Sequence, residues 1–135
     1  MSDKEKSRKR GMAILKKMGR ESLMQDQKAL LPDMYEMSVG HLFGDVWARP
    51  GLSLRERQLV TLAANIALVR PSGNYSHYRS AKHIGITHRE ICEIMIQVGH
   101  YAGWPAISHA VRQYTAVLEE DEEIKKGKKK KPTLV

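Results

Sequence analysis

Apolar residues recur about every 3.6 positions along almost the whole chain, the spacing that places them on one face of an α-helix. No segment alternates apolar and polar residues with the two-residue period of a β-strand. A chain of 135 residues corresponds to one domain with a small core, so association with further copies is expected. The sequence therefore predicts an all-α protein of about six helices.

Proline and glycine interrupt the helical pattern and give its boundaries. A first stretch from about Lys4 to Leu31 ends before Pro32, and a second runs from about Asp33 to Trp47. The second is predicted to bury Met34, Met37, His41 or Leu42, and Val46. A short helix is predicted over 75–83, between the Pro71 break and Gly85.

Two capping boxes mark further helix starts, because a Ser or Thr is followed three positions later by Glu. They are Ser53 with Glu56 and Thr87 with Glu90. Pro105 suits the first turn of a last helix that ends near Glu123. The apolar faces predicted for these three helices are Leu59, Leu62, Ala63 and Ile66, then Ile91, Ile94, Met95 and Val98, and finally Ile107, Val111, Tyr114 and Leu118.

The net charge of +8 lies mostly at one end of the chain. Residues 1–20 hold eight Lys or Arg against two acids, residues 119–135 six against five, and residues 21–118 nine against eight. The central part is thus nearly neutral, so nucleic acid is not an expected partner. The lysine-rich residues 124–135 are predicted to form a disordered, solvated tail.

Cys92 is the single cysteine, which excludes an intramolecular disulfide and a cysteine-rich zinc site. None of the histidines shows a zinc-binding spacing with a third ligand, so no metal is expected. The chain has no apolar run of membrane-spanning length and no signal-peptide pattern. A cytoplasmic location without membrane association is therefore expected.

The centre of the chain carries a series of short motifs in a defined order. They are Phe43-Gly44-Asp45-Val46-Trp47-Ala48-Arg49-Pro50-Gly51-Leu52, Arg55-x-Arg57-x-Leu59-Val60-Thr61-Leu62-Ala63, His77, Gly85-x-Thr87-x-x-Glu90-Ile91-x-Glu93 and Tyr101-Ala102-Gly103-Trp104-Pro105-Ala106. In this order and spacing the chain resembles the carboxymuconolactone decarboxylase family, over about residues 43–118. The expected organisation is an N-terminal helical extension (1–31), the family domain (32–123) and the tail (124–135).

The resemblance implies an alkylhydroperoxidase D-like helical domain that associates through its helices, commonly as a trimer or hexamer. It also implies two chemical branches. The thiol branch has Cys-x-x-Cys-x-x-x-His, and its two cysteines would fall at Arg70 and Gly73 here. Its relay carboxylate would fall at Gln58, which cannot transfer a proton. The chain resembles the other branch, the decarboxylases of aromatic compound catabolism, which need neither metal nor organic cofactor.

His77 is the first candidate for catalysis, because decarboxylation leaves electron density that a histidine can protonate. Its alternative role is a hydrogen bond near a helix start. Arg57 is the candidate for binding a substrate carboxylate in bidentate fashion. Its alternative is an ion pair with a nearby glutamate, and for Arg55 a solvated position is expected.

A second group of candidates lies on one helical stripe, which is formed by Glu93, Gln97 and His100. His100 would separate acid and base roles with His77, and Glu93 would contact the substrate. The stripe is equally typical of a surface or an oligomer contact. Tyr101 and Trp104 are candidates for an apolar wall against an unsaturated substrate, with packing at the helix break as the alternative.

Two functions remain open. The leading hypothesis is a cofactor-independent decarboxylase or isomerase that acts on a small carboxylated unsaturated or lactone acid and uses His77 for proton transfer. The alternative is a non-catalytic family member, an oligomeric binding module with basic termini.

Overall fold

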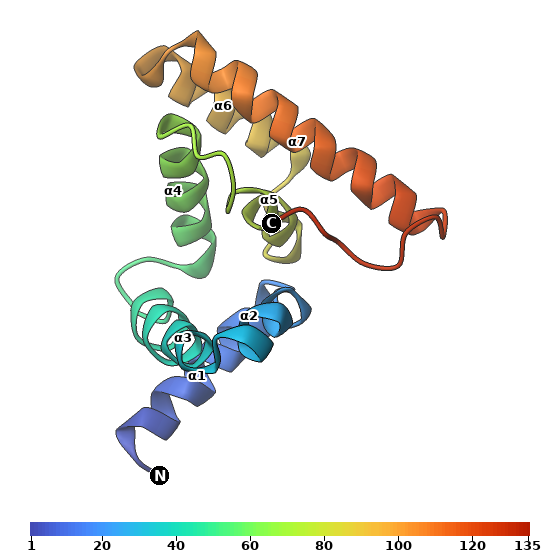
Figure 1. Ribbon diagram of the computed structural model, residues 1–135. Coiled ribbons are helices and arrows are strands. Elements are labelled where there is room, and N and C mark those ends of the chain that lie inside the picture. Colours follow the sequence, from blue (N-terminus) through green and yellow to red (C-terminus); the bar gives the residue numbers. More distant parts are fainter. The chain divides into compact units, whose positions relative to one another are not determined.

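The computed structural model describes residues 1–135, which form helices and turns with no β-strand (Figure 1). This confirms the predicted all-α class; seven α-helices are present where about six were expected. A 3₁₀ turn (η1) and a π-helical segment (η2) complete them. The elements are α1 Asp3–Lys17, η1 Ser22–Met24, α2 Gln25–Leu30, α3 Pro32–Met37, η2 Ser38–Trp47, α4 Leu54–Ala67, α5 Tyr75–His83, α6 His88–Ala102 and α7 Trp104–Lys125.

The chain divides into two compact units, residues 1–57 and 58–135, and α4 begins in the first and continues in the second. Each unit has its own cluster of buried apolar side chains. In the first unit these are Leu15, Met18, Met24, Tyr35, Val39, Phe43 and Trp47. In the second they are Leu62, Ile66, Tyr78, Ala81, Ile86, Ile91, Met95, Ala110, Tyr114 and Val117.

Helix α1 and segment η2 pack closely in the first unit because two glycines meet opposing backbone. A Cβ atom at Gly11 would lie 1.8 Å from the Val39 carbonyl oxygen, and one at Gly44 would lie 2.0 Å from the Ser7 carbonyl oxygen. Neither backbone oxygen can move aside without displacing its helix. The contact therefore requires glycine at both positions.

The face predicted for residues 33–47 is wrong. Met34, Met37, Leu42 and Val46 are exposed, as is His41, whereas Tyr35, Val39, Phe43 and Trp47 are buried. Three of the four buried residues lie in residues 38–47, which form the wider π-helix rather than a 3.6-residue helix, so a face drawn with the α-helical period fails there. In the α-helix α3 the buried residue is Tyr35 rather than Met34 or Met37.

The capping box predicted at Ser53 is confirmed, and at Thr87 the N-cap hydrogen bond is present. At the start of α4 the Ser53 hydroxyl accepts from the Glu56 N–H at 3.1 Å, and the Glu56 carboxylate accepts from the Ser53 N–H at 2.6 Å. At the start of α6 the Thr87 hydroxyl accepts from the Glu90 N–H at 3.1 Å. These bonds satisfy backbone donors that the helix leaves without an internal acceptor.

Helices α6 and α7 run side by side in the second unit (Figure 1). The face predicted for α7 is displaced by about one residue: Tyr114 is buried as expected, but Val111 and Leu118 are exposed. Ala106, Ala110, Gln113 and Val117 are buried instead. The buried Gln113 amide is compensated because it donates to the Arg70 carbonyl at 2.9 Å.

The disorder expected for residues 124–135 stays a prediction. After α7 the chain returns along the second unit, and the Thr133 N–H donates to the Glu120 carboxylate at 2.7 Å. The Gly73 N–H donates to the Val135 carbonyl at 2.9 Å. The tail thus contacts α7 and the turn before α5. No helix combines the length and apolar character needed to cross a membrane.

Candidate functional site

His77, the first candidate for catalysis, lies in the first turn of α5 and contacts Gln58 of α4. The Gln58 amide nitrogen lies 3.2 Å from His77 Nδ1 and 3.1 Å from the His77 carbonyl oxygen. The amide oxygen lies 3.4 Å from the same Nδ1. Gln58 is fully buried, and His77 is half-buried. One buried amide therefore holds both the ring and the backbone of His77.

The sequence places these two residues through two local rules. Gln58, Leu62 and Ile66 fall at i, i+4 and i+8, so they share the buried face of α4. The start of α5 is positioned by Asn74, whose carbonyl accepts from the His77 and Tyr78 N–H groups. The glutamine could have been expected to need a partner, because a buried amide is rarely left without a hydrogen bond. The pattern did not reveal that the partner is His77.

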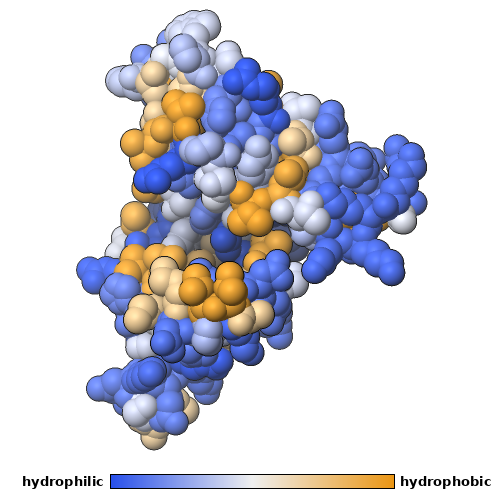
Figure 2. Space-filling model, in the orientation of Figure 1, coloured by the Kyte–Doolittle hydropathy of each residue, from blue (hydrophilic) through white to orange (hydrophobic).

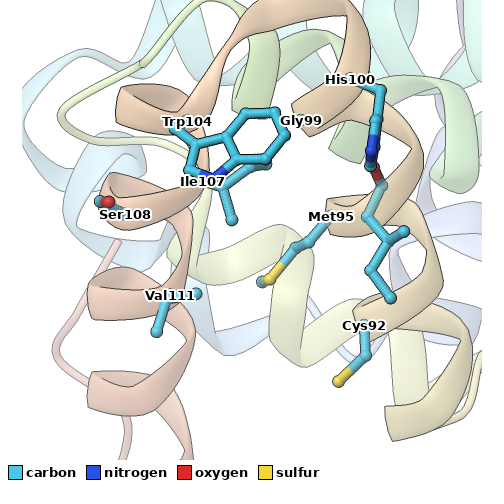
Figure 3. A pocket seen from close by; sticks show the side chains of 9 residues that line it. Cys92, Met95, Gly99, His100, Trp104, Ile107, Ser108 and Val111 are labelled. Carbon is cyan, nitrogen blue, oxygen red and sulfur yellow. The ribbon is translucent and has the colours of Figure 1, made fainter.

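A groove of about 660 Å³ lies between α6 and α7. Figure 3 shows Cys92, Met95 and His100 on α6, facing Trp104, Ile107 and Val111 on α7. Its lining is mostly apolar. The residues repeat at helical spacing on both helices: Cys92, Met95, Ile96, Gly99 and His100, then Trp104, Ile107, Ser108 and Val111.

His100 is the histidine that lines this groove. Its Nδ1 lies 2.8 Å from the Ile96 carbonyl oxygen, and a carbonyl oxygen only accepts, so Nδ1 carries the proton in this contact. The neutral ring then keeps a lone pair on Nε2, which suits it to accept a proton. The Trp104 ring meets it edge-on at 5.4 Å between centroids.

A chain of polar contacts reaches one end of the groove. Cys92 Sγ lies 3.7 Å from His88 Nε2, and His88 Nδ1 lies 2.7 Å from the Tyr114 hydroxyl. Burial raises the pKa of Tyr114, with Cys92 and Asp121 adding to the effect. Burial thus adds to the ordinary preference of this phenol for its neutral form.

The structure brings some of the expected site residues together. His100 and Trp104 share the groove, whereas Glu93 and Tyr101 are not among its lining residues. Tyr101 is 87% exposed, and Glu93 is exposed. His77 instead pairs with Gln58, a residue that the sequence did not propose for the site.

Arg57 belongs to the first unit, where its guanidinium donates to the Arg49 carbonyl at 2.9 Å. Of the predicted stripe Glu93, Gln97 and His100, only His100 lines the groove; Cys92 and Ile96, one position before Glu93 and Gln97, line it in their place. Helical spacing alone could have proposed either stripe. No group of three or more His, Cys, Asp or Glu side chains is placed to hold a metal ion.

Comparison with known proteins agrees with the helical fold and the motif order. The family model of the carboxymuconolactone decarboxylase family matches residues 32–116. The chain is 36% identical over 78 residues to 4-carboxymuconolactone decarboxylase of Acinetobacter baylyi, covering 58% of each chain. It is 34% identical over 97 residues to nitrosuccinic acid decarboxylase of Metarhizium robertsii, covering 72% of this chain and 66% of that enzyme.

A third relative, an uncharacterised protein of Paracoccus denitrificans, is 35% identical over 108 residues, covering 74% of this chain and 77% of that protein. The chain thus spans less than two thirds of the length of both named decarboxylases. The family match nevertheless covers most of the chain and includes α3 to α6 and much of α7. The chain belongs to the carboxymuconolactone decarboxylase family.

Proposed function

We propose that this protein is a decarboxylase of a small carboxylated acid, unsaturated or lactone-containing, with His77 as the residue that transfers the proton. Two relatives of the chain are named decarboxylases, which supports this reaction class. The observation that carries the proposal is the half-buried His77 ring held by a fully buried amide. A titratable ring in a defined orientation is what proton transfer to carbon requires.

The proposed step balances without an added oxidant or reductant. The bond between the carboxylate carbon and the substrate breaks, and CO₂ leaves. The electron pair of that bond stays on the conjugated substrate, where an electron-accepting lactone or nitro group would delocalise it. A proton from His77 then forms the new C–H bond, and solvent returns a proton to the ring. An isomerase would use the same proton transfer without loss of CO₂.

The remaining residues of the proposed site have separate roles. Arg57 is proposed to bind a substrate carboxylate, and His100 to act as a second proton carrier. Glu93, Tyr101 and Trp104 are proposed to contact the substrate. The resemblance further supports a reaction that uses neither metal nor organic cofactor.

The test replaces His77 by Ala and by Gln and measures CO₂ release from 4-carboxymuconolactone and from nitrosuccinic acid. We expect turnover to fall by about 10²-fold or more while circular dichroism stays unchanged. His83→Gln is the matched control, because His83 is an exposed histidine at the other end of α5. Full activity in both His77 variants would contradict the role proposed for His77. If the wild-type protein released CO₂ from neither acid, the proposed substrates would be contradicted.

We also propose that the protein forms a homo-oligomer, a trimer or hexamer, through α6 and α7. Apolar patches lie among hydrophilic ones on its surface (Figure 2). On these helices Tyr101, Trp104 (69% exposed), Ile96 and Val111 are exposed. Light scattering should give a mass several times 15.4 kDa, and Ile96→Glu should lower it. A monomeric wild-type protein would contradict this proposal.

The alternative of a binding module with basic termini receives less support. Several basic side chains of α1 already pair with acids of the same unit: Arg8 lies 2.9 Å from Glu36, and Arg10 lies 3.0 Å from Asp45. Such pairs reduce the positive field that α1 presents to an anionic partner. The decarboxylase is therefore the function we propose.

A further inference from the structure

We propose that Cys92 and His88 form a nucleophilic thiol site, at one end of the groove between α6 and α7, that adds to small apolar α,β-unsaturated carbonyl compounds. The inference goes beyond the proposed decarboxylase, because neither residue has a role in that reaction. Three observations lead to it. They are the contact between the two side chains, the buried tyrosine that holds the histidine, and the place of the sulfur in an apolar groove.

The start of α6 brings the thiol and the imidazole together. His88 is the first residue of the helix, and its N-cap Thr87 accepts from the Glu90 N–H at 3.1 Å. Cys92 follows His88 by four positions, so the two side chains are neighbours on one face of the helix. Cys92 Sγ lies 3.7 Å from His88 Nε2. The imidazole is thus placed to take the thiol proton, and the thiolate is the form of cysteine that attacks carbon.

Tyr114 of α7 holds the His88 ring from its other nitrogen. The Tyr114 hydroxyl lies 2.7 Å from His88 Nδ1, and the two rings stack with their centroids 5.4 Å apart. Tyr114 is itself 8% exposed and packs against the Tyr78 ring. In the imidazolium both ring nitrogens donate, and the thiolate and the phenol oxygen can both accept. Both contacts of His88 therefore suit the imidazolium–thiolate pair, whichever nitrogen carries the proton in the neutral ring.

The Cys92 sulfur belongs to the groove as well as to the histidine. The side chain is half-buried, and Figure 3 shows its sulfur directed toward the space between α6 and α7. The walls next to it are apolar, with Met95 on α6 and Ile107 and Val111 on α7. A volume of about 660 Å³ suits a small ligand, and these walls favour one with an apolar body. Sulfur is soft and polarisable, which matches the carbon of a conjugated double bond.

The proposed addition balances without an oxidant, a reductant or a further reactant. His88 takes the proton from Cys92 Sγ. The sulfur electron pair forms a bond to the β-carbon of the ligand, and the π electrons of the C=C bond move toward the carbonyl oxygen to give an enolate. The proton then passes from His88 to the α-carbon. The products are a thioether at Cys92 and a neutral imidazole.

The test measures how fast the full chain forms a thioether with N-phenylmaleimide at neutral pH. Because Cys92 is the single cysteine, one added probe mass per chain in a mass spectrum reports this site. We expect His88→Gln to react about tenfold or more slowly than the wild-type protein. Tyr114→Phe should also react more slowly, and the double variant no more slowly than His88→Gln, because the phenol acts through the ring. His83→Gln is the control, since His83 is an exposed histidine on α5, and it should keep the wild-type rate.

A second control moves the thiol within the groove. Cys92→Ser combined with Ser108→Cys places it on α7, the helix opposite His88, and should react no faster than His88→Gln. Equal rates in the wild-type protein and in His88→Gln would overturn the inference. So would a wild-type rate no higher than that of glutathione, which would also follow if an assembly of copies closed this end of the groove.

The ligand class is tested with a second probe of the same reactivity. Relative to glutathione, the wild-type protein should prefer N-phenylmaleimide over N-methylmaleimide, because the phenyl ring can contact the apolar walls. Val111→Glu should reduce this preference, since Val111 is exposed in the groove and a carboxylate there disfavours an apolar body. Equal preference for the two probes in the wild-type protein would overturn the proposed ligand class. Decarboxylation by His77 is not measured in any of these experiments, so their failure leaves the proposed function standing.

Discussion

The guanidinium of Arg79 on α5 donates a hydrogen bond to the carboxylate of Glu120 on α7, and the two side chains are 5% and 3% exposed. Lys129 lies 2.6 Å from the same carboxylate, and the Thr133 N–H donates to it at 2.7 Å. Arg79 also donates to the Leu134 carbonyl. One buried carboxylate thus connects α5, α7 and the C-terminal segment.

This arrangement predicts an acid-sensitive contribution to stability. Burial raises the pKa of Glu120, but hydrogen bonds from Lys129, Thr133 and Arg79 outweigh it and lower the pKa from 4.5 to about 2. Because the folded-state pKa is depressed, the contribution is complete above pH 4.5 and is lost as the pH falls toward 2. Glu120→Gln should lower the free energy of unfolding by about 3 kcal/mol at neutral pH.

Urea denaturation from neutral pH to pH 2 measures this effect. The difference between wild type and Glu120→Gln should shrink as the pH drops below 4.5. Glu119→Gln is the control, because the neighbouring Glu119 is exposed. A constant difference over this pH range would show that the carboxylate does not titrate as the structure indicates.

Gly44→Ala should destabilise the first unit. The new Cβ atom would meet the Ser7 carbonyl oxygen at 2.0 Å, so α1 and η2 would have to separate. Overpacking of this kind costs about 1–3 kcal/mol of unfolding free energy. Gly40→Ala, in the same segment, meets nothing within 4 Å and should be neutral or slightly stabilising. Equal melting temperatures of the two variants would argue against the close packing of α1 and η2.

Ser53→Ala should weaken the start of α4. The substitution removes the hydroxyl that accepts from the Glu56 N–H, and the loss of such a cap costs about 1 kcal/mol. Ser53→Thr keeps an accepting hydroxyl and should retain most of the stability. Thermal unfolding followed by circular dichroism distinguishes the two. If both variants melted alike, the cap would not contribute.

His100→Gln should lower turnover without loss of stability, because His100 is exposed in the groove and its Nε2 suits it to accept a proton. We expect kcat to decrease by about tenfold or more in the decarboxylation assay. His109→Gln is the control, since His109 also contacts a backbone carbonyl, that of Arg70, at 3.0 Å. Unchanged kinetics in His100→Gln would remove this residue from the proposed site.

Much of the helical pattern could be predicted, because helix boundaries depend on neighbours in sequence. The Ser53 and Thr87 caps and the break before Pro105 are local features, and the structure has them. Buried faces were predicted well where the helix is regular, as for Leu62 and Ile66 on α4. The prediction failed over residues 33–47. A π-helix over residues 38–47 changes the period on which the prediction depends, and in α3 Tyr35 is buried while Met34 and Met37 are exposed.

The sequence by itself determined the helical class, the family and the absence of the paired thiols, because these follow from the order and spacing of residues. It also indicated His77 and His100 as the histidines to examine. Only the tertiary structure decided that Gln58 holds His77, that His100 lies in a groove with Trp104, and that the C-terminal segment contacts Glu120. Each of these contacts joins different elements, and their geometry depends on helix packing that local residue patterns do not encode.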